Sequence, residues 1–550
     1  MKYTILFTLL LSAVLFFSPH CWSQIGWKYG YGSVYGLVVE AGFVAPDNMG
    51  NIYGTGWGDL DSVRFGSFVL YNPAHLWFTF ITKANASGYV WVKGISNGNV
   101  KPSGIATDNA GNVYVLGTYD TSASIDGVTI TNPTPLFMAD FLFKISPAGT
   151  VLWGKSIPFQ TNFGQGICIS NTGTVYVAGN TNRSTFTVDT VSVSLVGTHP
   201  NLCILELTSS GTAIRAAGFG PFGYVTALRA SEKNNIYVTG FSTNITFGST
   251  TLTSGTYSDI NFIAKLDSSL HPLWAKGFSQ NVFIHDIATG KDDAVYFTGN
   301  TDTASVHIDT ATVPYAGTTN IIVGRYDSAG AFSWVRWLRG SGGTGRGIAA
   351  DLCGKIWIGA SIPAATTIYY NDTTVSYPGT GFDRYLVAGF NTAGHYIGSA
   401  VLPSGGDDES TIAVDNAGSF YVCGDYINAS LTFGTSVLPY VTEESYFFAK
   451  YTYDTIGCTA DISLETADLS AIGTINIFPV PATGECNVLS SMPFAQGAKA
   501  ELYDMAGRLL NTWALSGERT SLSLIDIASG LYICRLISGN NIVMKKLVVN

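Results

Sequence analysis

A repeated motif with a period of about 61 residues constrains the fold of this chain more than any other feature of its sequence. Each copy contains two short apolar strands that flank a polar turn. The copies at 104–117 (GIATDNAGNVYVLG) and 411–424 (TIAVDNAGSFYVCG) share nine of fourteen residues. A fixed period of this length predicts a repeat architecture. One turn residue just before the second strand marks each of the seven copies: Gly50, Gly111, Gly173, Asn234, Asp293, Gly354 and Gly418.

The turn residues explain why each copy forms a hairpin. Every marker residue is Gly, Asn or Asp, the types that best tolerate a positive φ. Three residues earlier, an Asp or Ser suits the first position of a turn, where its side chain bonds the backbone. The alternative, a calcium loop, is disfavoured because one carboxylate per turn cannot supply six oxygen ligands. Six copies carry this residue: Asp47, Asp108, Ser170, Ser231, Asp351 and Asp415.

A second hairpin follows in most copies, as in FLFKISPAGTVLWGK (141–155), and a variable stretch separates the two hairpins. Each unit therefore holds at least four strands, and seven such units predict an all-β, seven-bladed β-propeller over residues 24–458. The second hairpin carries a tryptophan in four copies: Trp91, Trp153, Trp274 and Trp334. The last copy lacks a tryptophan strand, whereas the N-terminal segment IGWKYG (25–30) has an unmatched one. We therefore expect the strand around Trp27 to complete the last blade and close the ring.

The N-terminus is typical of a secretory signal peptide over residues 1–23. Lys2 supplies the positive charge, Tyr3 to Phe17 form the apolar core, and Ser23 is small enough to precede the cleavage site. Cys21 suggests a lipoprotein as an alternative, but His20 stands where such sites require a small residue. We therefore expect export with cleavage after Ser23.

Charge and cysteine content restrict the possible partners. Only 12% of the residues are charged, and the formal net charge is −10. An acidic body has no electrostatic reason to bind nucleic acid or anionic lipid. Seven cysteines remain after signal removal, an odd and widely spaced set that is not a disulfide framework. Cys486 and Cys534 lie in one small domain and can pair, but sequence does not show connectivity.

From residue 459 the repeat gives way to a polar linker (459–474) and then to alternating strands that predict a small antiparallel β-sandwich over 475–550. This region resembles the C-terminal sorting domain of proteins exported by the type IX (Por) secretion system. Val480 departs from the family pattern, which usually has Asn there. The matching elements, in order, are Phe478-Pro479, Pro481-Ala482-Thr483-Gly484, Glu501-Leu502-Tyr503-Asp504, Gly507-Arg508, Ser529-Gly530-Leu531-Tyr532 and Lys546-Leu547-Val548-Val549.

The resemblance implies a route and a set of partners. After crossing to the periplasm, the chain is read by the type IX translocon and reaches the outer surface of a Gram-negative bacterium or the medium. In the family the domain is usually removed, and the cargo is released or attached to lipopolysaccharide. The resemblance assigns the sorting role to Pro479, Pro481, Gly484, Tyr503, Asp504, Gly507, Arg508, Gly530, Tyr532 and Lys546.

No segment carries a recognisable catalytic, cofactor or metal motif. The sequence has no HExxH motif, and the Gly-rich segment 341–347 lacks the end of a phosphate loop and is interpreted as a flexible connection between blades. The consecutive carboxylates of 407–409 are typical of a solvated loop. We therefore expect an extracellular binding or adhesion module without cofactor, whose ligand is a glycan, a protein or a surface polymer. The alternative is a hydrolase or lyase that acts on extracellular polysaccharide from one propeller face.

Overall fold

The computed structural model is all-β and divides into two compact units, residues 1–458 and 459–550, which are described separately. None of the described residues forms a helix that could cross a membrane. The expected signal peptide (1–23) and linker (459–474) lie outside the described residues. The structure describes residues 26–549 except 35–38, 60, 73–75, 134–136, 160–165, 196–199, 255–258, 303, 316, 318, 352–353, 371–372, 379–382, 404–410, 417, 428, 434–435, 442–444, 453–474, 491–492, 495–496, 504–508 and 539–540.

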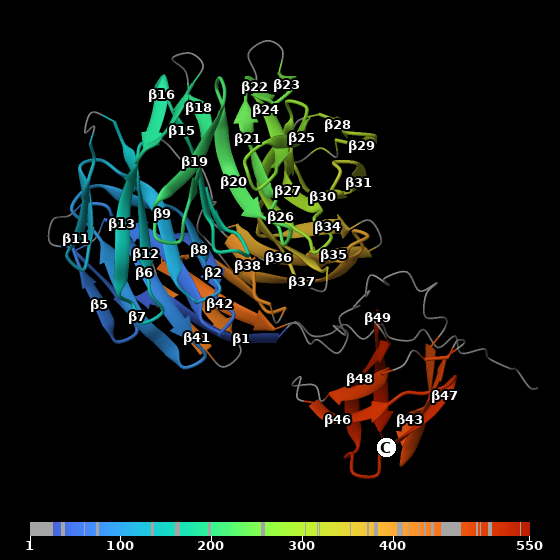
Figure 1. The fold of residues 1–550 in the computed structure, drawn as a ribbon. Coiled ribbons are helices and arrows are strands. Elements are labelled where there is room, and N and C mark those ends of the chain that lie inside the picture. Colours follow the sequence, from blue (N-terminus) through green and yellow to red (C-terminus); the bar gives the residue numbers. More distant parts are fainter. Residues whose placement is uncertain are drawn as a thin grey trace, which may run out of the picture. The chain divides into compact units, whose positions relative to one another are not determined.

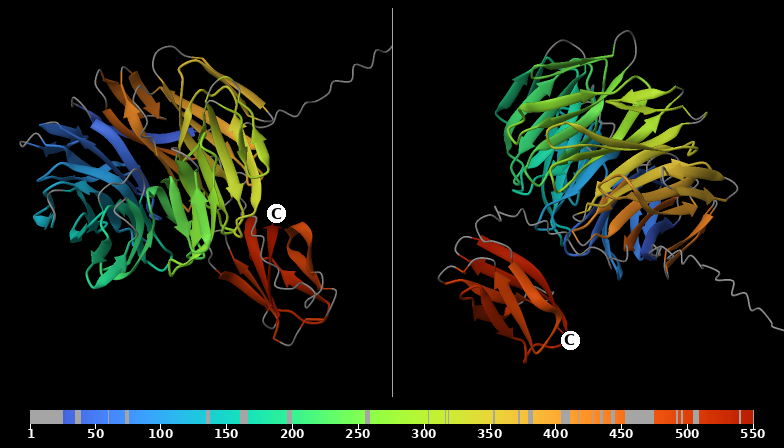
Figure 2. Two further views of the ribbon diagram at one scale, coloured as in Figure 1. Left: turned by 90° about the horizontal axis from the view of Figure 1, so that it is seen from above. Right: turned by 90° about the vertical axis from the view of Figure 1, so that its right-hand side faces the viewer.

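The first unit is a ring of four-stranded antiparallel sheets, or blades, which follow one another in chain order (Figures 1 and 2). In each blade the first strand lies innermost and the fourth lies outermost. The predicted class, an all-β propeller, is confirmed. The first six blades, with bounds in chain order, are β2 (Val39–Pro46), β3 (Ile52–Gly58), β6 (Phe78–Asn85) and β7 (Gly88–Ile95); β8 (Val100–Thr107), β9 (Val113–Tyr119), β12 (Ala139–Ile145) and β13 (Val151–Ile157); β14 (Ile167–Ile169), β15 (Val175–Thr181), β18 (Asn201–Leu207) and β19 (Ala213–Phe219); β20 (Tyr224–Ala230), β21 (Ile236–Ser242), β24 (Ile260–Leu266) and β25 (Pro272–Gly277); β26 (Val282–Thr289), β27 (Val295–Thr301), β30 (Asn320–Tyr326) and β31 (Phe332–Leu338); β32 (Thr344–Ala350), β33 (Ile356–Ile362), β36 (Arg384–Phe390) and β37 (Tyr396–Pro403).

The seventh blade joins the two ends of the propeller. Its strands are β38 (Thr411–Val414), β39 (Phe420–Tyr426), β42 (Ser445–Thr452) and, from the N-terminus, β1 (Gly26–Val34). Strand β1 runs antiparallel to β42, with Trp27 opposite Tyr451 and Gly32 opposite Phe447. The predicted ring closure by the strand around Trp27 is therefore confirmed.

The variable stretch of each copy forms a third hairpin that the sequence analysis did not predict. Its inward side chains alternate and are fully buried, as at Ile245 (0% exposed) and Phe247 (2%). Ion pairs tie some of these hairpins to the preceding blade, as between Lys155 Nζ and Asp189 Oδ1 at 2.6 Å. The hairpins are β4 (Ser62–Phe65) with β5 (Phe68–Tyr71), β10 (Ser122–Ile125) with β11 (Val128–Thr131), β16 (Thr185–Val188) with β17 (Val191–Ser194), β22 (Asn244–Phe247) with β23 (Thr250–Thr253), β28 (Val306–Ile308) with β29 (Ala311–Val313), β34 (Thr366–Tyr370) with β35 (Thr373–Tyr377) and β40 (Ala429–Phe433) with β41 (Ser436–Val441).

The tryptophans of the outer strands hold neighbouring blades together. Each indole Nε1–H donates to a carbonyl in the last turn of the next blade, as from Trp274 to Ser328 at 3.2 Å. In the third blade Arg215 takes this position and donates to Ser269 O at 3.4 Å. The other tryptophan bonds run from Trp91 to Pro147, from Trp153 to Ser209 and from Trp334 to Thr392, at 3.2, 3.3 and 2.9 Å.

A glycine lies against the indole ring at each of these contacts. Gly330 has φ +80°, and a Cβ atom built on it would stand 2.9 Å from Trp274. Both the left-handed backbone and the close approach of the ring therefore favour glycine. Where Arg215 replaces the tryptophan, the turn carries Leu270 at φ +65° instead. The remaining glycines of this kind are Gly149, Gly211 and Gly394.

We expect Gly330→Ala to destabilise the propeller by about 2–4 kcal/mol, because a left-handed alanine costs roughly 1–2 kcal/mol and overpacking costs roughly 1–3 kcal/mol. Gly127→Ala is the matched control, because Gly127 has φ +83° but no atom within 4 Å of its added Cβ. Urea unfolding followed by tryptophan fluorescence measures both changes. Equal losses in the two variants would contradict the role assigned to the glycine–indole contact.

The second unit is a seven-stranded arrangement around one apolar core. A parallel contact between Ala482 of β43 and Val549 of β49 joins its two antiparallel groups. The core includes Cys486 and Cys534, both buried as free thiols, so the pairing left open by the sequence is not present. The strands are β43 (Ile475–Thr483), β44 (Glu485–Ser490), β45 (Lys499–Tyr503), β46 (Leu509–Ala514), β47 (Arg519–Ser523), β48 (Gly530–Ser538) and β49 (Asn541–Val549).

Candidate functional site

The propeller has two different faces. The Asp-type turns between the first and second strands form one of them, which we call the turn face. On this face Asp47 Oδ1 accepts hydrogen bonds from the backbone N–H groups of Met49 and Asn51, both at 2.9 Å. The predicted turn role is confirmed for Asp47, because its carboxylate is committed to its own loop. In the part of the chain that the structure describes, no group of three or more His, Cys, Asp or Glu is placed to hold a metal ion.

The opposite face, which we call the loop face, carries the longer connections between strands. Antiparallel register places the first residue of β2, the last of β3 and the first of β6 together there: Val39 pairs with Gly58, which pairs with Phe78. Inner strands of neighbouring blades run in the same direction, as shown by the bond from Thr107 Oγ1 to Pro46 O at 2.7 Å. Loops of different blades therefore gather on this face, where sequence can vary without disturbing the sheets.

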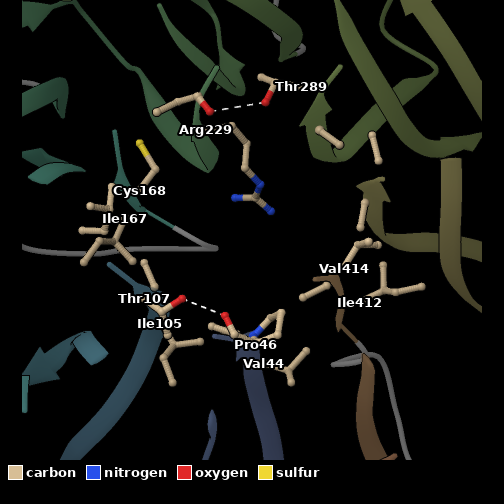
Figure 3. Close-up of a pocket in the computed structure, with 18 of the residues that line it drawn as sticks. Val44, Pro46, Ile105, Thr107, Ile167, Cys168, Arg229, Thr289, Ile412 and Val414 are labelled. Carbon is tan, nitrogen blue, oxygen red and sulfur yellow. Dashed lines mark hydrogen bonds between the residues drawn. The ribbon is translucent and has the colours of Figure 1, made fainter. Parts of the chain in front are cut away.

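An axial channel of about 310 Å³ runs between the inner strands (Figure 3). Its walls are mostly Ile, Val, Ala and Thr. One position, two residues before the first residue of the Asp-type turn, is alanine in five blades. Cys168 and Arg229 are the exceptions, and Arg229 is the one charged side chain among the described residues that line the channel. The alanines of this layer are Ala45, Ala106, Ala288, Ala349 and Ala413.

Arg229 extends into the channel, as Figure 3 shows, and forms an ion pair with the next blade. Its Nη2 donates to Asp286 Oδ1 at 2.6 Å, and its Nη1 donates to Leu228 O at 3.0 Å. The carboxylate also accepts from the backbone N–H groups of Ile287 (2.8 Å) and Ile348 (3.0 Å). Three donors from three segments thus hold one buried carboxylate beside the channel.

Like Arg229, Asp286 is a charged residue at a repeat position that is uncharged in the other blades. The other blades have Phe, Gly, Ala or Thr at this position, four residues before the turn. Burial raises the pKa of Asp286, and the nearby Arg229 opposes that shift. The nearby Cys168 thiol is also buried, and burial raises its pKa to about 12. It is therefore protonated at neutral pH and is a poor nucleophile.

Two aromatic clusters lie on the loop face. In the first, Trp57 at the end of β3 and Trp77 just before β6 have ring centroids 5.1 Å apart. The ammonium of Lys101, from the next blade, lies 3.5 Å from the centroid of Trp57 and 3.7 Å from that of Trp77. Trp77 is 41% exposed, whereas the inter-blade tryptophans Trp91 and Trp334 are 9% exposed. Trp77 therefore differs from the tryptophans that are buried between blades, and packing between blades does not account for its presence.

The second aromatic cluster belongs to the fourth and fifth blades. Tyr224, the first residue of β20, stacks on Phe241 near the end of β21, with centroids 4.9 Å apart and planes at 19°. Phe283, at the equivalent end of β26, is 37% exposed. His285 follows on the same strand and bonds the Asn300 side chain at 2.8 Å. Exposed aromatic groups on a rigid scaffold mark contact surfaces for other molecules.

The residues that the sequence assigned to sorting occupy several strands of the second unit. Pro479 and Pro481 lie in β43, Lys546 lies in β49, and Gly484 forms the following turn at φ +73°. Tyr503 ends β45 and donates to Glu501 Oε2 at 2.8 Å, whereas Gly530 begins β48. Tyr532 is 8% exposed and donates to Ala528 O at 2.6 Å. Asp504, Gly507 and Arg508 lie outside the described residues.

Sequence reasoning missed the Arg229–Asp286 pair and the two aromatic clusters. The signal for the pair was present in the repeat itself. Aligning the copies on their turns shows one arginine among alanines and one aspartate among small or apolar residues. The segment 341–347 was also misread in part, since residues 344–347 begin strand β32 and only the first half connects blades.

Comparison with known families identifies both parts of the chain. Residues 476–550 match the secretion system C-terminal sorting domain, and residues 90–118 match a β-propeller repeat. The sorting domain indicates secretion, and the type IX secretion system is implied as its handler. Export to the cell surface or beyond it follows. No curated protein matches the chain.

Comparison with solved structures gives little information about the function of this chain. A streptogramin B lyase shares 11% identity, with 77% of this chain and 99% of that chain covered and a TM-score of 0.37. PorZ, a surface component of the type IX secretion system of Porphyromonas gingivalis, shares 10% identity over 94% of this chain and 82% of that one, with a TM-score of 0.19. A protein of unknown function from Bacteroides caccae shares 12% identity over 54% and 81%, with a TM-score of 0.30. At these values the likenesses carry no argument about activity.

Proposed function

We propose that this exported propeller is an extracellular carbohydrate-binding module that uses its loop face. The observation that carries the proposal is the Trp57–Trp77 cluster, with Trp77 41% exposed on a rigid blade. Aromatic faces provide large apolar contact areas at low entropic cost, and sugar rings present C–H faces that suit them. The Lys101 ammonium places a positive charge beside the two rings. Retention on lipopolysaccharide after export would keep this face at the cell surface.

We expect Trp77→Ala to weaken binding to a glycan at least tenfold, which corresponds to about 1.4 kcal/mol. The reason is the loss of the exposed ring without a change in the core. The measurement is a glycan array of neutral and acidic oligosaccharides, followed by titration calorimetry on the strongest hit. Tyr369→Ala is the matched control, because Tyr369 is 44% exposed on the β34–β35 hairpin of another blade.

Two outcomes would contradict the proposal. One is unchanged affinity in Trp77→Ala with a normal unfolding midpoint, which would place the contact elsewhere. The other is the release of new reducing ends from the bound glycan, which would indicate a polysaccharide-active enzyme instead. A reducing-end assay on the same glycan samples tests the second outcome.

A further inference from the structure

We propose that the axial channel binds a small organic carboxylate on the open edge of the Arg229 guanidinium. This inference is independent of the loop-face proposal, because it rests on a different group of residues. The channel volume of about 310 Å³ is at the lower end of ligand-site volumes and suits a molecule the size of a monosaccharide. Figure 3 shows the guanidinium directed toward the centre of this space.

The donors of Arg229 are only partly used. A guanidinium has five N–H groups in a planar fork. Asp286 occupies one on Nη2, and Leu228 O occupies one on Nη1. The remaining three have no partner among the described residues. An arginine side chain that is 19% exposed thus presents free donors inside a channel whose other lining side chains are mostly apolar.

Stability alone does not explain the pair. Five blades fill the position of Arg229 with alanine, and they close the same channel without a charge. Burying an ion pair is often no more stabilising than an apolar replacement, because desolvation offsets the attraction. Two charged residues that depart from the repeat in adjacent blades, 57 residues apart and bonded to each other, indicate a requirement beyond folding.

A carboxylate is the chemistry that matches the open edge. Arginine binds carboxylates through two parallel N–H···O bonds, which a neutral hydroxyl cannot reproduce. Asp286 accepts one hydrogen bond from the guanidinium and also accepts from the N–H groups of Ile287 and Ile348, so it leaves other Arg229 donors available. The partly exposed apolar side chains of Ile169, Ala413 and Val414 then contact the carbon skeleton of the ligand. Free acids and the uronate ends of polysaccharides both have this chemistry.

The test is titration calorimetry of the folded propeller with glucuronate, with glucose and with an oligosaccharide that ends in a uronate. The informative variant is the double substitution Arg229→Ala with Asp286→Ala, which restores residue types found at these positions in other blades and leaves no unpaired charge. Arg384→Ala is the control, because Arg384 is not among the residues that line the channel and donates to Pro378 O. The unfolding midpoint of each variant confirms that it is folded.

We expect the unchanged protein to prefer glucuronate over glucose at least tenfold, and the double variant to lose this preference while Arg384→Ala retains it. Tighter binding of the oligosaccharide than of glucuronate identifies a polysaccharide end as the source, and the reverse order identifies a free acid. Both orders support the site. Absence of a preference for glucuronate, or a preference that survives in the folded double variant, would overturn the inference. Glycan binding on the loop face should persist in the double variant, which separates this result from the loop-face proposal.

Discussion

Removal of residues 475–550 is expected to abolish export and to leave the chain in the periplasm. The physical reason is that the sorting domain is a separate compact unit with its own buried core, so its loss removes the export address without opening the propeller. Immunoblots of periplasm, outer membrane and medium measure the distribution. We expect at least a tenfold shift from the outer fractions to the periplasm.

The control for this deletion is Ile525→Ser, a change at a site that is 81% exposed in the same domain. It should leave export unchanged, because no core contact is lost. Unchanged export of the truncated chain would contradict the role of the domain. Loss of the protein from every fraction would instead report degradation, so the unfolding midpoint of the purified truncated chain should be measured in parallel.

Deletion of β1, residues 26–34, is expected to have the largest effect on stability. Six positions of this strand pair with β42, and at about 1 kcal/mol per net hydrogen bond the loss is on the order of 5 kcal/mol. The deletion also exposes β42 as an edge strand. We expect the thermal midpoint to fall by on the order of 10 °C and the chain to aggregate more readily. A chain that begins at Gly26 is the control, and an unchanged midpoint after the deletion would contradict ring closure.

Much of this fold could be predicted from the sequence, because seven copies of the repeat show which turn and strand positions are shared. Turn residues such as Gly111 and Asp108 recur at fixed spacing, and the unmatched strand around Trp27 predicted that the N-terminus closes the ring. The β22–β23 hairpin escaped prediction because its strands are only four residues long. Only Ile245 and Phe247 carry the inward pattern on β22, and two residues are too few for a period to be recognised.

The candidate sites were harder to predict, for a reason that lies in the geometry of a ring. Arg229 and Asp286 are 57 residues apart and meet because neighbouring inner strands lie side by side. Trp57 and Lys101 likewise come from different blades. Periodicity identifies equivalent positions, but contacts between them depend on how the blades pack. The inter-blade tryptophans show the same limit. The repeat identified Trp274 as a recurrent position, but it did not predict the hydrogen bond from Trp274 to Ser328.

The channel and the Trp57–Lys101 contact both require a closed ring, because each is assembled from different blades. The most direct measurement is the unfolding midpoint of a circular permutant that begins at Val39 and carries residues 26–34 after Thr452 through a short turn. Gly26 lies opposite Thr452, so a tight hairpin joins them. We expect the permutant to regain the stability lost on deleting β1. A permutant no more stable than the deletion variant would contradict closure of the ring by this strand.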